Sequence, residues 1–259
     1  MSGAPRVPAS LVGLVGLFAI WEVASRTDLV PAYYLRPPSV VFPRLLELVF
    51  ADANFQRALV ATLSATVLAL VIAVLVAVPA GLLLGSVPAV RHGVMTLVEF
   101  LRPIPSVALI PLALLTFGTG PDTKVTLAVY GALWPILFNT MYALDEIDPL
   151  HVETARAFGT GRLGVLTRVA LPHAAPFVLT GIRLSFAIAM GVAVSVELLA
   201  GGSVGIGQVV LEAGSGGFDM DTVLAGTVLA GLIGYGANAG LELLQRKAFA
   251  WSTPRGGAR

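Results

Sequence analysis

Six long apolar runs constrain this chain more than any other feature of its sequence. The longest run without a charged side chain, Leu59–Leu84, exceeds the roughly 20 apolar residues with which a helix crosses a bilayer. The other five runs are Val7–Ala24, Val94–Phe117, Val125–Ala143, Ala174–Ala200 and Val223–Leu244. These runs predict an all-α membrane protein with six transmembrane helices in a single domain, 1–259, whose core helices occupy about 59–244.

Composition supports a membrane protein over a soluble one. The chain is 56% hydrophobic and only 12% charged, whereas about a quarter of the residues of a soluble domain are charged. A net charge of +1 gives no indication of a nucleic-acid partner, and the absence of cysteine excludes disulfides and thiol chemistry. The first run lacks a small-residue cleavage pattern, so we interpret it as a retained helix and not a signal peptide.

Prolines predict two irregular places between the runs. The segment Pro37–Pro43 is expected to be extended, and 44–50 could form a short interfacial helix. Inside the third run, Arg102-Pro103-Ile104-Pro105 predicts a break in the helix, because proline removes a hydrogen bond and clashes with the preceding turn.

The longest polar interval, 145–172, carries a short helix signal. Asp148 is a suitable N-cap, Pro149 suits the first helical position, and Gly159 is placed where a left-handed residue would end the helix. A helix over 149–158 is about 15 Å long, half a bilayer core, so it must lie outside the membrane. From the pattern alone, an ordinary solvated loop between helices is the alternative.

The distribution of basic residues predicts the orientation. With both termini inside, eleven of the sixteen Lys and Arg residues lie on the inner side and five, including Lys124, on the outer side. The interval 145–172 and the tail 245–259 are then cytoplasmic.

Small residues recur every four positions in the last two runs, as expected where helices approach closely in lipid. They are Ala187, Gly191 and Ser195, then Gly226, Ala230 and Gly234. The spacing does not decide whether these contacts lie within one chain or between two.

Three polar residues inside the runs could line a translocation path: Arg183, Glu197 and Asn139. Arg183 and Glu197 lie fourteen positions apart, about 21 Å on a straight helix, so they cannot pair with each other. The alternatives are that Arg183 extends its side chain to the membrane surface, that Glu197 bonds a neighbouring helix, and that Asn139 joins two helices.

Signals of catalysis are weak. Gly201-Gly202-Ser203-Val204-Gly205 fits G-x-S-x-G, but all three histidines precede Ser203, so a glycine-rich loop is the better interpretation. The chain has no P-loop motif, and its histidines lack metal-ligand spacing. We therefore expect no catalytic residue and no metal in this chain.

The polar interval resembles the EAA loop of bacterial ABC-importer permeases. Glu153-Thr154-Ala155 is followed after three residues by Gly159 and, nine residues later, by Val169-Ala170-Leu171-Pro172, with Thr154 and Val169 departing from the pattern. Further stretches are similar to the nitrate, sulfonate and taurine branch, namely Arg102–Pro105, Phe117–Gly120, Trp134–Thr140 and Gly181–Arg183.

This resemblance implies the small permease (MetI-like) fold in the bacterial inner membrane, with a cytoplasmic coupling helix. It implies a homodimer, two cytoplasmic P-loop ATPase subunits that bind ATP and Mg, and an extracytoplasmic solute-binding protein. The residues placed at or near the ATPase contact are Glu153, Thr154, Ala155, Gly159, Leu171 and Pro172.

The function expected from the sequence is import of a small anion such as an aliphatic sulfonate, taurine or nitrate. A permease for a non-anionic solute such as a pyrimidine precursor is one alternative. An ion-coupled secondary transporter is another, although no internal repeat is found and only Glu197 offers a carboxylate near mid-membrane. A membrane-embedded enzyme lacks a convergent catalytic set.

Overall fold

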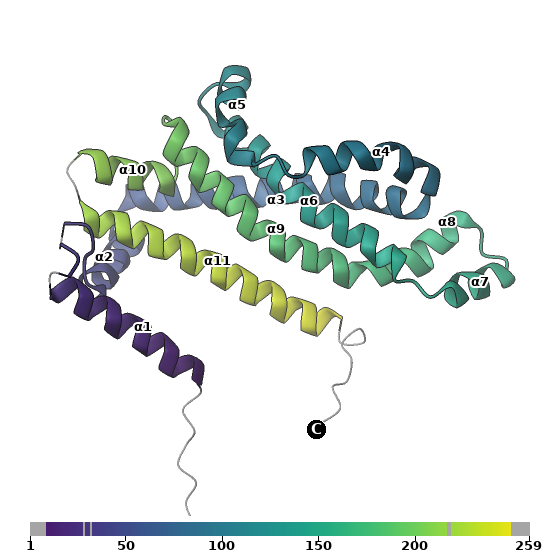
Figure 1. Cartoon of the computed structure of the whole chain (residues 1–259), viewed down its shortest axis with the longest axis horizontal. Helices are drawn as coiled ribbons and strands as arrows, with labels where there is room; N and C mark the ends of the chain where they lie inside the picture. Colours follow the sequence, from purple (N-terminus) through teal and green to yellow (C-terminus); the bar gives the residue numbers. More distant parts are fainter. Residues whose placement is uncertain (1–8, 28, 32, 217–218, 250–259) are drawn as a thin grey trace, which may run out of the picture.

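The computed structural model describes residues 9–27, 29–31, 33–216 and 219–249, and every regular element in these ranges is helical (Figure 1). The predicted tail is described only as far as residue 249, and the chain termini lie outside the described residues. The elements are α1 Ala9–Arg26, α2 Pro38–Ala51, α3 Ala53–Ser86, α4 Pro88–Leu101, the 3₁₀ turn η1 Ser106–Leu109, α5 Ile110–Phe117, α6 Pro121–Asp145, α7 Pro149–Ala157, α8 Arg162–Val165, the π-helical turn η2 Leu166–Ala170, α9 Leu171–Ala200, α10 Ile206–Gly216 and α11 Met220–Ala248.

Four helical segments among the described residues are long and apolar enough to cross a membrane. They are α3, α6, the continuous segment Arg162–Ala200 and α11. The bent pair formed by α4 and the helix from Ser106 to Phe117 raises the number to five if the pair is one span. A multi-pass helical membrane protein is thus confirmed, and the count of six spans stays a prediction.

The centre of the bundle is formed by α3, α6 and α9. Small side chains permit this packing: Ala69, Ala73 and Ala77 of α3 are completely buried. A Cβ added at Gly81 would lie 2.6 Å from Thr140 Cβ, and one added at Gly181 would lie 2.9 Å from Ile136 Cα. Close backbone approach is what stabilises helix pairs in lipid, and it fixes α6 between α3 and α9.

Of the two small-residue stripes identified in the sequence, only the one on α11 makes a close helix contact within the chain. Gly226 is buried and meets Val210 of α10, so this stripe makes a contact within the chain. Ala187 is exposed, and nothing lies within 4 Å of a Cβ built at Gly191. The α9 stripe therefore faces outward in this structure, and the intrachain helix contacts come instead from glycines such as Gly81 and Gly181.

The segment 37–43 differs from its extended prediction. Only Pro37 is extended, with φ −68° and ψ 147°, and α2 begins at Pro38 and includes Pro43. Pro38 stands at the first helical position, where its missing N–H costs no helical hydrogen bond. Burial then favours the helix, because Val41, Leu45 and Leu48 pack against Ala225 and Leu229 of α11.

The predicted break at Arg102–Pro105 is confirmed, and the helices on either side are bent by 80°. Pro105 cannot donate a hydrogen bond to the Leu101 carbonyl four residues earlier. The hydroxyl of Tyr130 on α6 donates to that carbonyl instead, at 2.6 Å. The Arg102 guanidinium lies 4.3 Å from the ring centre of Phe138, also on α6, so α6 stabilises the break.

Candidate functional site

The α7 helix begins as its sequence predicts. The Asp148 carboxylate accepts a hydrogen bond from the backbone N–H of Leu150 at 2.9 Å, and Pro149 occupies the first helical position. Such a cap satisfies one of the N–H groups that a helix start leaves free. The capped start lies four residues after the end of α6, so α7 is separated from the membrane-spanning helix.

The end of α7 is a glycine-terminated Schellman turn. Gly159 has φ +79°, its N–H donates to the Arg156 carbonyl at 2.9 Å, and the Thr160 N–H donates to the Ala155 carbonyl at 3.0 Å. A left-handed conformation costs a residue other than glycine about 1–2 kcal/mol. Gly159 thus reverses the chain toward α8, as the sequence predicts.

No residue of α7 is buried, and among the described elements the helix packs mainly against α8 and η2 of its own loop. Glu153 and Thr154 are exposed, and Ala155 is half-buried. Two large apolar side chains at the helix ends are also exposed, Leu150 by 62% and Phe158 by 86%. Figure 1 shows α7 at one end of the molecule, beside α8. This short amphipathic surface is available to a partner.

The return from the loop differs from the prediction of a polar connection leading to a span from Ala174. Helix begins at Arg162 and continues through α8, η2 and α9 to Ala200. Pro172 has no N–H to donate to the helix. The residue before it, Leu171, donates its N–H to the Leu166 carbonyl five residues earlier, which is the hydrogen bond of a π-helix. Leu171 and Pro172 therefore join a π turn to α9, which connects the loop with the bundle through unbroken helix.

A second polar group of residues lies inside the bundle around Glu197, which is completely buried. Its carboxylate accepts hydrogen bonds from Lys124 Nζ at 2.7 Å, from Thr62 Oγ1 at 2.8 Å and from the Gly207 N–H at 2.9 Å. These partners belong to α6, α3 and α10. Glu197 on α9 thus bonds three other helices, which is the alternative raised for it from the sequence. A role of Glu197 in a translocation path stays a prediction.

Lys124 and Thr62 belong to this group but were not identified from the sequence. Lys124 was counted with the outer basic residues, but its side chain is only 3% exposed, and Nζ also donates to the Val204 carbonyl at 3.1 Å. The available signal was its position near the start of an apolar run in a chain with only two lysines. Thr62, which also accepts a hydrogen bond from the Ile206 N–H at 2.9 Å, gave no signal.

The glycine-rich loop after α9 closes over this group. Gly201 and Gly202 have φ of +63° and +68°. A Cβ at Gly205 would overlap the Glu197 carboxylate, and one at Gly207 would lie 2.7 Å from Glu197 Cβ. The G-x-S-x-G match is therefore explained by close backbone approach to a buried charge.

The other two path candidates are not brought together with Glu197. Arg183 is half-buried on α9, with its Nη1 3.8 Å from a carboxylate oxygen of Glu242 on α11. Asn139 donates to the Pro135 carbonyl of its own helix at 2.8 Å, and its Cβ would lie 3.3 Å from a Cβ at Gly181. A role of these residues in a path stays a prediction.

No group of three His, Asp or Glu side chains in the described ranges could hold a metal ion.

Comparisons with known proteins agree with this arrangement. Residues 73–249 match the family described as binding-protein-dependent transport system inner membrane component. The chain is 31% identical to the taurine transport system permease protein TauC of Escherichia coli over 250 residues, 95% of this chain and 90% of that one. It is 27% identical to the bicarbonate transport system permease protein CmpB of Synechococcus elongatus, covering 91% of this chain and 87% of that protein.

Among solved structures, an inward-facing form of the MetNI methionine ABC transporter is similar in fold. The TM-score is 0.67 at 22% identity, over 79% of this chain and 97% of the solved chain. The small ABC-permease fold predicted from the sequence is thus confirmed.

Proposed function

The chain belongs to the family of binding-protein-dependent transport system inner membrane components, and we propose that it is the transmembrane subunit of an ATP-driven importer for a small anion. Its relatives are permease subunits and not enzymes, so the chain is a translocation component. ATP and Mg would be bound by separate P-loop ATPase subunits, because the sequence has no phosphate-binding loop of its own.

The observation that carries this proposal is the exposed, doubly capped α7. Its two ends are fixed by Asp148 and Gly159, while Leu150 and Phe158 remain uncovered. A rigid helix with exposed apolar ends is suited to a groove in another protein. We assign it to the ATPase contact, with Glu153, Thr154 and Ala155 on the docking helix.

The helical path from the loop supports a mechanism. Closure of two ATPase subunits on ATP would move a pair of α7 helices, and that movement would pass through η2 to Leu171 and Pro172 at the start of α9. At the far end of α9, Glu197 is bonded to α3, α6 and α10. A displacement of α9 would therefore move the other bundle helices together and switch access from one side to the other.

The outward-facing stripe of α9 supports self-association. Ala187 and Gly191 are exposed and adjacent on one helix face, and small residues of this spacing permit close packing of two helices in lipid. We propose a homodimer, with a solute-binding protein on the extracytoplasmic side and both chain termini in the cytoplasm.

The solute class follows from the relatives. Taurine carries a sulfonate group and bicarbonate is an anion, and two relatives that align with nearly the whole chain are named for transport of these solutes. We propose a small oxyanion of the sulfonate, nitrate or bicarbonate type.

Co-expression with candidate P-loop ATPases tests the proposal. The natural chain should retain its cognate ATPase through purification, and Glu153→Arg combined with Gly159→Trp should lose it. Glu212→Arg on α10 is the control, because it makes the same charge change at the opposite end of the molecule. Uptake of labelled taurine should be abolished by vanadate. Uptake that is stopped by an ionophore and not by vanadate would instead indicate a secondary transporter.

A further inference from the structure

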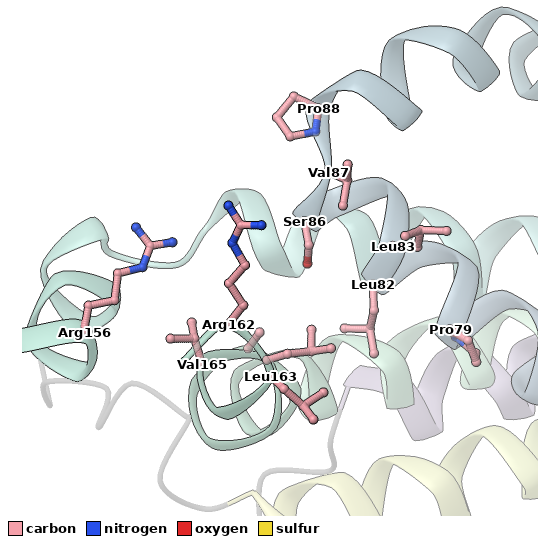
Figure 2. A pocket seen from close by; sticks show the side chains of 12 residues that line it. Pro79, Leu82, Leu83, Ser86, Val87, Pro88, Arg156, Arg162, Leu163 and Val165 are labelled. Carbon is pink, nitrogen blue, oxygen red and sulfur yellow. The ribbon is translucent and has the colours of Figure 1, made fainter. Parts of the chain in front are cut away.

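A cavity of about 880 Å³ lies where the end of α3 faces α8 and η2 (Figure 2). Pro79, Leu82 and Leu83 of α3 form one wall, and Leu163 and Leu166 form the opposite one. By the distribution of basic residues, this is the cytoplasmic end of the bundle. The cavity is thus at the level where lipid headgroups meet the hydrocarbon core.

The charge of the cavity is entirely positive. Arg156 and Arg162 are its only charged lining residues, and neither side chain has a hydrogen bond or ion pair with any residue in the described ranges. By contrast, Arg91 nearby is held by both carboxylate oxygens of Asp145, at 2.8 and 3.0 Å. Two unpaired guanidinium groups beside one cavity are suited to a phosphate group.

The cavity is polarised along its length. Figure 2 shows Arg156 at one end and Pro79 at the other, with the guanidinium of Arg162 pointing away from the leucine side chains. Pro79 lies seven residues before Ser86 on α3, about 10 Å deeper toward the membrane centre. Leu75, 68% exposed, continues the apolar surface one turn further. A ligand that fits has an anionic head and an apolar tail.

We propose that this cavity binds one anionic phospholipid, with its phosphate between Arg156 and Arg162 and an acyl chain along α3. Arg156 belongs to α7, whereas Leu82 and Leu83 belong to α3. The bound lipid therefore connects the cytoplasmic helix to the membrane-spanning bundle. Among the described elements α7 otherwise packs mainly against α8 and η2 of its own loop, so the lipid fixes the position of the helix that we assign to the ATPase contact.

Lipid binding to the purified full-length chain tests the proposal without an ATPase or a solute. Native mass spectrometry would compare dioleoylphosphatidylglycerol with dioleoylphosphatidylcholine, which have the same acyl chains. One phosphatidylglycerol should bind more tightly than phosphatidylcholine. Loss of one arginine (Arg156→Gln or Arg162→Gln) should weaken phosphatidylglycerol binding about fivefold, and loss of both about 25-fold, as expected from about 1 kcal/mol for each basic side chain near anionic lipid.

Two further variants separate the cavity from general surface charge. Arg168→Gln removes a basic residue of the same loop outside the cavity, and it should change phosphatidylglycerol binding less than about twofold. Ser86→Trp fills the cavity without removing charge and should weaken binding. Equal binding of both lipids, an effect of Arg168→Gln as large as that of the double variant, or unchanged binding in Ser86→Trp would overturn the proposal. The proposal would also be overturned if the variant Arg156→Gln/Arg162→Gln bound phosphatidylglycerol normally but no longer formed a dimer. That result would mean that a second copy of the chain, and not a lipid, occupies the cavity.

Discussion

The two polar regions of this molecule form their hydrogen bonds in opposite ways. The α7 loop forms its hydrogen bonds with partners two to five residues away, such as Asp148 to Leu150 and Thr160 to Ala155. The Glu197 group forms its bonds across the bundle, with Thr62 and Lys124 at sequence separations of 135 and 73. The loop can therefore keep its shape while it moves as a unit, whereas the Glu197 group holds four helices in one arrangement.

Breaking the buried pair of Lys124 and Glu197 should have the largest effect on stability. Glu197→Gln and Lys124→Met each leave one buried charge without its opposite charge, and each should lower the free energy of unfolding by about 3–5 kcal/mol. The double variant Glu197→Leu/Lys124→Met leaves no buried charge and should recover a large part of that loss. Fluorescence-detected size-exclusion chromatography after heating measures the order of stability. A double variant less stable than both single variants would contradict the charge-pair explanation.

Adding a side chain next to Glu197 should have the next largest effect on stability. Gly205→Ala places a methyl group against the Glu197 carboxylate and should cost about 1–3 kcal/mol, as overpacking does. Gly236→Ala on α11 is the matched control, since nothing lies within 4 Å of its added Cβ. The same thermal assay should separate the two variants, and equal melting would refute the close approach at Gly205.

In the loop, the largest effect is expected at Gly159. A valine there must adopt φ near +79°, at a cost of about 1–2 kcal/mol that should fall on the end of α7 and not on the bundle. Hydrogen exchange should become faster in 149–160 and remain unchanged around Glu197. Gly161→Val provides the comparison, because Gly161 has φ −70°. Faster exchange throughout the bundle would mean that the loop is not independent.

Removing the N-cap should have a smaller effect. Asp148→Ala leaves the Leu150 N–H without its acceptor and should destabilise α7 by about 1 kcal/mol, whereas Asp148→Ser should retain most of the cap. Exchange of the first amides of α7 measures the difference. If alanine and serine gave the same protection, capping would not hold the start of the helix.

The smallest effect is expected for a charge pair in water. Arg91 and Asp145 form two hydrogen bonds, as strong in geometry as the Lys124 pair, but their side chains are 33% and 43% exposed. Arg91→Gln should therefore cost only about 0.2–1 kcal/mol. A loss as large as that of Lys124→Met would show that burial does not account for the difference between the two regions.

Local signals in the sequence predict much of the structure. The break at 102–105, the start of α7 at Pro149 and its end before Gly159 follow from backbone chemistry within a few residues, so they could be predicted. The extended segment at 38–43 was predicted incorrectly, because burial of Val41 against α11 outweighs the preference of its prolines.

By itself, the sequence determined that this is a multi-pass helical membrane protein, where α7 begins and ends, and which family the chain belongs to. These features depend on apolar length, on bonds between near neighbours and on short motifs. Only the tertiary structure decided that Lys124 is buried, that Glu197 joins four helices and that Arg156 and Arg162 share one cavity. The physical reason is distance along the chain: a buried charge is tolerated only where packing brings its partners to it, and no pattern in one segment reveals which partners these are.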